Sequence, residues 1–169
     1  WTGTAGDRDW ATNSNWCGAI KTNSTGCTNT GVEPSSSSTA THIAVFDRTC
    51  SASLLACSPN LNSNANYTMY GLKINTDYLG TFTQVDSKTM TIGAGGFNQT
   101  GGTFNGSNAN ITNTGPVTLN GGNFRSTSAD FTIQQNAFSI SDSTTLDANN
   151  GRLQFTNVCD PSIRSSVAG

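Results

Sequence analysis

A hexapeptide from Gln99 to Phe104 (Gln-Thr-Gly-Gly-Thr-Phe) recurs from Leu119 to Phe124 (Leu-Asn-Gly-Gly-Asn-Phe), twenty residues further along the chain. Weaker copies lie on either side, in Gly-Thr-Phe over 80–82 and Ser-Thr-Thr-Leu over 143–146. Paired glycines at the same place in successive repeats mark a tight turn or a positive φ. We therefore expect these glycines to form one corner of a coiled chain.

A shorter period runs through the same region. Apolar residues peak about every seven positions, at Phe97, Phe104, Ile111, Val117/Leu119, Phe124, Phe131/Ile133, Phe138/Ile140, Leu146 and Leu153/Phe155. The intervening Gly, Asn, Ser and Thr are poor helix formers, whereas alternation with β-branched neighbours is typical of half-buried strands. Three such faces predict an all-β parallel β-helix, or β-solenoid, with about 21 residues per rung. Two Asn-Gly turns, Asn105-Gly106 and Asn150-Gly151, keep an antiparallel meander sandwich open as the alternative.

The composition favours a folded extracellular protein. Only 34% of the residues are hydrophobic and 11% charged, with 26 Thr, 20 Ser, 20 Asn and 18 Gly. The net charge of −2 and the eight Phe, three Trp and three Tyr argue against disorder. The sequence has no basic stripe, so we do not expect a nucleic-acid partner. No apolar run reaches the roughly 20 residues of a membrane span. Because the sequence begins at Trp1 without a visible signal peptide, we expect a mature product or an excised fragment.

We expect one domain with four parts. Residues 1–47 form an N-terminal cap and first strand (41–47), 48–69 a cysteine-bearing loop, 70–158 about four rungs, and 159–169 a C-terminal tail. The ends of such a stack expose unpaired backbone groups and must be capped or docked. Trp1, Trp10 and Trp16 suggest a cap at one end, and nothing comparable is visible at the other.

Five cysteines favour disulfides and therefore an oxidising compartment. Local pairing predicts Cys17 with Cys27 and Cys50 with Cys57, although other connectivities are possible. Cys159 is then left over. It is either a buried free thiol, a member of a different pairing, or a bond to a neighbouring subunit.

The N-terminal region carries a resemblance. Its signature comprises Trp1-Thr-Gly, Trp10, Asn15-Trp16, Pro34 and Ile43-Ala-Val-Phe-Asp47, followed by Gly71-Leu-Lys-Ile74 and Gly80-Thr-Phe-Thr83. These motifs resemble repeat units of large bacterial secreted adhesin-type surface proteins. The resemblance implies a right-handed parallel β-helix that is exported and has a structural or adhesive role. The Cys17–Cys27 insertion, the Cys50–Cys57 loop and Thr41-His42 depart from that pattern.

No catalytic, metal or cofactor site is expected. On a 21-residue period, Asp86 is followed by Ser107 and Ser128, and Asp130 by Gly151, so no acid/base pair forms between rungs. The segment 147–151 (Asp-Ala-Asn-Asn-Gly) lacks the spaced ligands of a calcium loop and predicts an Asx-turn instead. We therefore do not expect an enzyme.

Three surface features have alternative interpretations. Asn-x-Ser/Thr sequons, which are glycosylation acceptors in a suitable host, occur at Asn23, Asn66, Asn98, Asn105 and Asn110. A threonine array of the ice-binding kind breaks where Thr103 is followed by Asn123 one rung later. The tryptophans suit either sugar stacking or packing of the cap, and their clustering favours packing.

These patterns predict an extracellular, cell-surface structural or adhesive subunit that assembles end to end into a filament. The assembly residues are Cys159 and the final strand with Leu153 and Phe155, received by the cap of Trp1, Trp10 and Trp16 on another copy or by a neighbouring solenoid repeat. The alternatives are a module that binds cell-surface glycans and a carbohydrate-active β-helix enzyme.

Overall fold

The computed structural model is a parallel β-solenoid of about four turns, with about 22 residues per turn and 48% strand. It describes residues 1–2, 5, 7–17, 42–48, 50, 57–59, 61, 66–135, 137–156 and 162–165. The strand pairs in this part of the chain are all parallel, which excludes the antiparallel meander. The predicted β-solenoid is therefore confirmed.

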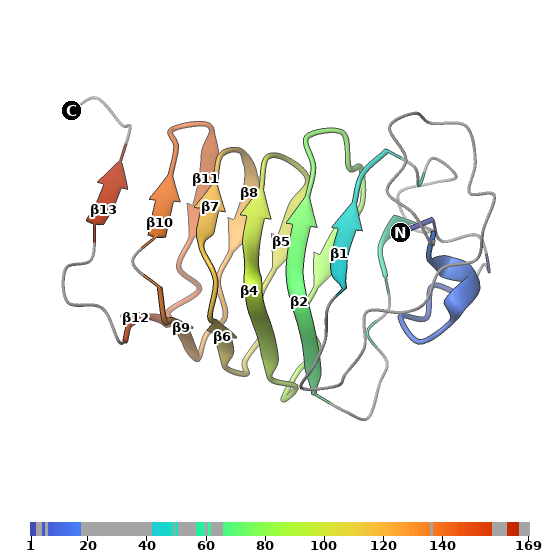
Figure 1. Cartoon of the computed structure of the whole chain (residues 1–169), viewed down its shortest axis with the longest axis horizontal. Helices are drawn as coiled ribbons and strands as arrows, with labels where there is room; N and C mark the ends of the chain where they lie inside the picture. Colours follow the sequence, from blue (N-terminus) through green and yellow to red (C-terminus); the bar gives the residue numbers. More distant parts are fainter. Residues whose placement is uncertain are drawn as a thin grey trace.

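The described residues form thirteen short strands and one 3₁₀ turn. The turn is η1 (Asn13–Asn15), and the strands are β1 (Ile43–Phe46), β2 (Tyr67–Ile74), β3 (Thr81–Thr83), β4 (Met90–Gln99), β5 (Thr103–Asn105), β6 (Ile111–Asn113), β7 (Val117–Leu119), β8 (Gly122–Arg125), β9 (Asp130–Ile133), β10 (Ala137–Ile140), β11 (Thr144–Asp147), β12 (Arg152–Phe155) and β13 (Ser162–Ser165). Figure 1 shows them side by side along one axis, with the N-terminal region at one end and β13 at the other.

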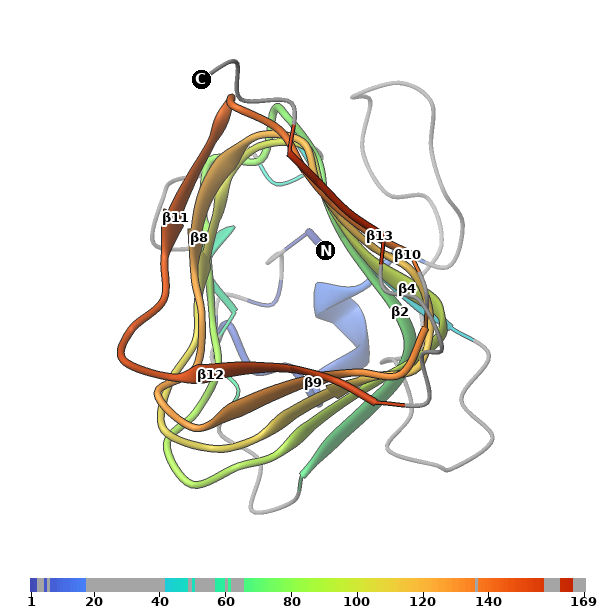
Figure 2. The ribbon, with the colours of Figure 1, turned by 90° about the vertical axis from the view of Figure 1, so that its left-hand side faces the viewer.

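The strands line three faces. The first face comprises β6, β9 and β12, the second β1, β7, β10 and β13, and the third β3, β5, β8 and β11. The long strands β2 and β4 bend from the first face onto the second, with a register shift between Met69 and Gly71. Seen from the C-terminal end, the chain runs counter-clockwise from β8 through β9 to β10 while it advances toward the viewer, so the coil is right-handed (Figure 2).

The repeated hexapeptide forms the corner between the second and third faces. Phe104 in β5 pairs in register with Phe124 in β8. Gly102, just before β5, and Gly122, the first residue of β8, have φ of +60° and +79°. A Cβ on Gly122 would lie 2.5 Å from the carbonyl carbon of Gly101, so both the φ angle and the rung spacing require glycine here.

Aromatic rings stack through the core from turn to turn. Phe82, Phe104 and Phe124 lie parallel, with centroids 5.6 and 5.2 Å apart and interplanar angles of 10° and 11°. Each ring is nearly fully buried, which stabilises the fold by about 1.5–3 kcal/mol per side chain. The next residue in this column is Leu146, which pairs with Phe124.

An aromatic cap closes the N-terminal end of the core. Trp1, Trp10 and Trp16 are each 4% exposed. Trp10 contacts Trp16 edge-on at 4.7 Å between centroids and lies 5.9 Å from Phe82, the first ring of the column. Trp16 Nε1 donates to the Trp10 carbonyl at 2.8 Å. This cluster, with Phe46 of β1, covers the side chains that the first turn would otherwise expose.

Polar side chains fix the loop that carries these tryptophans. Asn15 is fully buried, and its Nδ2 donates to Asp7 Oδ1 at 2.7 Å and to the Asp9 carbonyl at 2.9 Å. The Asn15 Oδ1 accepts from the Ala5 N–H at 2.9 Å, and the Asn15 carbonyl accepts from the Thr2 N–H at 2.8 Å. A buried amide with these partners holds the loop in one conformation.

Two segments expected to lack regular structure contain strand. β2 begins at Tyr67, inside the predicted loop 48–69, and β13 lies inside the predicted tail 159–169. β13 pairs with β10 through Phe138 and Ile163, so the second face continues one turn further than expected. Its apolar content is a single isoleucine, too little for the period to be visible in the sequence.

A threonine ladder runs along the first face. Thr68, Thr91, Thr112 and Thr132 are partners in successive register pairs, and Gln154 follows them in β12. The break seen at Thr103 and Asn123 belongs to the third face. Cross-strand threonine pairs each contribute about 0.2–1 kcal/mol, so the ladder helps to hold the turns in register.

Candidate functional site

The C-terminal end of the solenoid exposes part of its core. Leu146 and Leu153 occupy the inward positions that Phe124 and Phe131 hold one turn earlier. They are nevertheless 54% and 44% exposed, because no later turn among the described residues covers them. Together with Phe138 they line an apolar hollow of about 80 Å³, whose lining residues are Leu119, Phe124, Ser126, Phe131, Phe138, Leu146, Ala148, Gly151 and Leu153. We call this surface the open end.

The backbone at the open end also lacks partners. In the described part of the chain β11 pairs only with β8, and β12 pairs only with β9. Each therefore presents one edge of N–H and C=O groups to any strand that adds in the axial direction. The predicted assembly residues Leu153 and Phe155 both lie in β12, and Phe155 packs edge-on against Phe138 at 5.7 Å.

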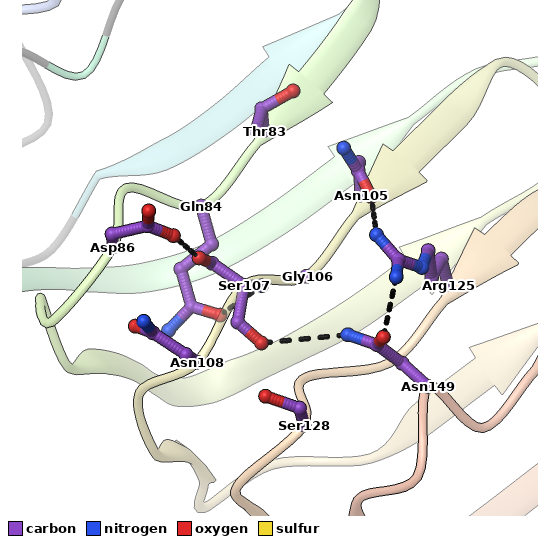
Figure 3. A pocket seen from close by; sticks show the side chains of 10 residues that line it. All are labelled: Thr83, Gln84, Asp86, Asn105, Gly106, Ser107, Asn108, Arg125, Ser128 and Asn149. Carbon is purple, nitrogen blue, oxygen red and sulfur yellow. Dashed lines mark hydrogen bonds between the residues drawn. The ribbon is translucent and has the colours of Figure 1, made fainter.

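A second feature is a polar hollow at the corner between the third and first faces. Its volume is about 310 Å³, and it is lined by Thr83, Gln84, Asp86, Asn105, Gly106, Ser107, Asn108, Arg125, Ser128 and Asn149. Figure 3 shows these side chains, which come from the turns that follow β3, β5, β8 and β11 or from the ends of those strands. We call this hollow the corner cleft.

Arg125 is held by three residues from the two neighbouring turns, Asn105 on one side and Asp147 and Asn149 on the other. Its Nε donates to Asp147 Oδ2 at 3.1 Å, its Nη1 to Asn105 Oδ1 at 3.3 Å and its Nη2 to Asn149 Oδ1 at 2.5 Å. Asn149 has φ of +52°, and its Nδ2 donates to the Ser126 carbonyl at 3.0 Å. The guanidinium is thereby fixed on one wall of the cleft (Figure 3).

Asp86 lies on the opposite wall, where it accepts a hydrogen bond from Ser107 Oγ. The buried Gln84, which is 1% exposed, holds this wall in place. Its Oε1 accepts from the Ser107 N–H at 3.0 Å, and its Nε2 donates to the Ala109 carbonyl at 3.0 Å. The predicted succession of Asp86 by Ser107 is therefore present in the structure. The role of Arg125 was not predicted, because its three partners lie 20, 22 and 24 residues away along the chain and no single period connects them.

The expectation that Asp130 faces Gly151 is wrong. Asp130 pairs in register with Arg152, 22 residues later, and accepts Arg152 Nε at 2.9 Å and Nη2 at 3.0 Å. The hydrogen bonds from Arg152 hold the pKa of Asp130 below its ordinary value. A turn of 22 residues instead of 21 moves the arginine into the position assigned to glycine.

The loop after β11 is an Asx-turn, as predicted. Asp147 Oδ1 accepts the Asn149 N–H at 2.8 Å, and the Gly151 N–H bonds to the Ala148 carbonyl at 2.9 Å. Within the described residues, His, Cys, Asp and Glu form no group of three that could hold a metal ion. The same part of the chain contains no helix with the length and apolarity to cross a membrane.

The predicted disulfide between Cys50 and Cys57 is present, with Cα atoms 5.3 Å apart. Both cysteines are fully buried, and Tyr78 Oη donates to the Cys57 carbonyl at 2.6 Å, which ties the cross-linked segment to the first turn of the solenoid. Cys17 is also disulfide-bonded. Its predicted partner Cys27 and the candidate intermolecular Cys159 lie outside the described residues.

Burial of Trp1, Trp10 and Trp16 leaves none of their ring faces for stacking on a sugar.

Among the sequon asparagines, Asn66 and Asn110 are exposed, Asn98 and Asn105 are half-buried, and Asn23 lies outside the described residues. Glycosylation therefore stays a prediction, for which Asn66 and Asn110 are the more accessible acceptors.

Fold and surface together define a right-handed parallel β-solenoid with a sealed N-terminal end, an open C-terminal end and a polar corner cleft. No protein-family model, curated protein or solved structure matches the chain.

Proposed function

We propose that this chain is an extracellular structural or adhesive module that associates end to end with a second copy through its open end. The observation that carries the proposal is the exposure of Leu146 and Leu153 at positions that are core positions in every earlier turn. Covering these leucines would stabilise the complex by about 25 cal/mol per Å² of apolar surface removed from water.

The chemistry of the open end favours a β-strand partner. An incoming turn would cover Leu146 and Leu153 and would satisfy the free edges of β11 and β12 through backbone hydrogen bonds. An isolated helix would cover the leucines but would leave the strand edges without backbone hydrogen bonds. A second copy of the chain supplies both, and a neighbouring solenoid repeat would bind the same end in the same way.

The two ends of the molecule differ, which favours a pair over the filament expected from the sequence. The three tryptophans of the cap are buried, and the loop that carries them exposes Asp7, Asn13 and Ser14. This polar outer surface is a poor match for the apolar open end. The open end of a second copy is a better match, and such a self-complementary contact gives a closed two-fold dimer.

Two further features support an extracellular location. The Cys50–Cys57 disulfide requires an oxidising compartment in most organisms. The sequence is rich in Thr, Ser and Asn, and only 11% of its residues are charged, a composition that suits contact with other surfaces without long-range attraction. The adhesive target would be a cell or matrix surface.

Sedimentation velocity over a concentration series tests the association. The wild-type chain should form dimers as the concentration rises, and Leu153→Lys should remain monomeric because a charge cannot be buried in the contact. Leu79→Lys is the matched control, since Leu79 is 63% exposed but lies between β2 and β3 near the other end. A monomeric wild type, or equal loss in both variants, would contradict the proposal.

A non-reducing gel separates this contact from a covalent one. If Cys159 links two chains, the dimer band should disappear on reduction and in Cys159→Ser. A dimer that persists in Cys159→Ser in sedimentation velocity, yet is lost in Leu153→Lys, identifies the open end as the interface.

A further inference from the structure

The corner cleft is a second hollow, and it shares no lining residue with the open end. We propose that it binds a neutral carbohydrate of one or two sugar units, lying along the axis of the solenoid. The cleft lies at the junction of the third and first faces, whereas the open end lies across the axis beyond β11 and β12. End-to-end association would therefore leave the residues of the first three turns in the cleft accessible.

The lining excludes an apolar ligand and offers no excess of charge. Its side chains are all polar apart from the glycine. One carboxylate, Asp86, and one guanidinium, Arg125, face the cleft, and Arg125 is already paired with Asp147 at 3.1 Å. An anion would meet Asp86, and a cation would meet Arg125, whose charge is already balanced by Asp147, so a neutral polar ligand fits best.

Several hydrogen-bonding groups in the cleft remain unused by the described residues. Arg125 has five N–H groups, of which three are engaged. Asn105 and Asn108 are bonded through their Oδ1 atoms, which leaves the Nδ2 groups available. One carboxylate oxygen of Asp86 is available in the same way. Sugar hydroxyls accept from guanidinium and amide N–H groups and donate to carboxylates, so this mixture of donors and acceptors suits them.

The site is also preorganised. Arg125 is held by Asp147, Asn105 and Asn149, while Ser107 orients Asp86 and is itself fixed by the buried Gln84. Side chains that are already immobile lose little conformational entropy when a ligand binds. Donors and acceptors fixed in this way favour ligands whose hydroxyl groups have one relative orientation.

The dimensions set the size of the ligand. The volume of about 310 Å³ lies at the lower end of the range for small-molecule sites. Asp86, Ser107 and Ser128 come from three successive turns, and strands of neighbouring turns are about 4.8 Å apart. The cleft therefore extends for roughly 10 Å along the axis, which accommodates a short segment of a linear glycan.

Titrations followed by amide NMR shifts test the proposal. The neutral probes are cellobiose, maltose and lactose at millimolar concentrations, and galacturonic acid and glucosamine are the charged counter-probes. At least one neutral disaccharide should cause saturable shifts confined to residues 83–86, 105–108, 125–128 and 149. Arg125→Gln and Asp86→Asn should each weaken that binding by about tenfold or more, because each removes a charge-assisted hydrogen bond.

Arg152→Gln is the matched control. Arg152 makes the same kind of ion pair between turns, with Asp130, but it does not line the cleft. Unchanged spectra outside the cleft in each variant verify that the fold is retained, and binding by Arg152→Gln should stay within twofold of the wild type. The proposal is overturned if no neutral probe gives saturable shifts, if a charged probe binds more tightly, or if Arg152→Gln weakens binding as much as Arg125→Gln. In that event the Arg125 network serves only to brace the corner.

Discussion

At each end of the solenoid, the inward side chains of the terminal turn lack a neighbouring turn among the described residues, and the two ends differ in how these side chains are covered. At the N-terminal end, non-periodic sequence supplies Trp1, Trp10 and Trp16, which cover the first turn and are each 4% exposed. At the C-terminal end, the inward positions of the last turn hold Leu146 and Leu153, and about half of each side chain is exposed. The repeat therefore encodes the stack but not its ends, and each end needs its own covering.

Similar apolar residues therefore have different roles at the two ends. A core residue in the cap stabilises the fold of the single chain. An inward-facing residue at the open end adds little to the stability of the single chain while it is exposed, and it contributes mainly to association. Stability measurements and association measurements should therefore separate the two ends.

The largest effect is expected from opening the cap. Trp10 contacts Trp16, Phe82 and Tyr67, so Trp10→Ala should lower the free energy of unfolding by about 3–5 kcal/mol, as large-to-small changes in aromatic cores do. Leu153→Ala at the open end should lower it by less than about 1 kcal/mol, because the side chain is already 44% exposed. Urea unfolding at a concentration where the chain is monomeric measures both. Equal losses would show that the open end is covered in solution.

A smaller effect should follow from removing the disulfide next to the cap. Cys50 and Cys57 are seven residues apart, and the chain entropy of so short a loop corresponds to about 2–3 kcal/mol. The Cys50→Ser/Cys57→Ser variant should lose that amount. Its faster amide exchange should be confined to the neighbourhood of β3, where the Thr81 N–H bonds to Ser58 Oγ at 2.9 Å. Faster exchange in β11 and β12 to the same extent would contradict a local role.

The sequence was sufficient for the architecture of the middle of the chain. The repeated Gly-Gly pairs predicted a corner, and the structure has positive φ at Gly102 and Gly122. The apolar peaks predicted which residues face inward, and Phe104, Phe124 and Leu146 do share one column. These features were visible because strand alternation and turn chemistry are local properties.

The surface sites were not predictable from a constant period. Partners in adjacent turns are separated by 20 residues for Phe104 and Phe124 but by 22 for Asp130 and Arg152, because the corner loops differ in length. A shift of one residue moves every side chain to the other face of the strand. A constant period therefore did not predict the Asp130–Arg152 pair, the threonine ladder or the Arg125 network. The inward-facing residues were still predicted correctly, because apolar residues recur on every face.

The smallest predicted effect is a difference in acid sensitivity between the ends. The Asp9 N–H, with the side chains of Asn15 and Thr12, holds the pKa of Asp7 below its ordinary value. A carboxyl whose pKa is lower in the folded chain contributes stability that is present above the unfolded pKa and is lost as the pH falls through the folded one. Acidification below about pH 4 should therefore loosen the cap loop, and tryptophan fluorescence should report it.

Asp7→Asn provides the control for this transition. The amide carries no charge at any pH, so the variant should be less stable at neutral pH and should lack the part of the acid response that Asp7 contributes. Asp130→Asn should leave the tryptophan signal unchanged, because Asp130 has its pKa lowered by Arg152 at the other end of the stack. If Asp130→Asn altered the fluorescence transition as much as Asp7→Asn, the two ends would be coupled through the stack, and the view that each end is stabilised by its own contacts would be wrong.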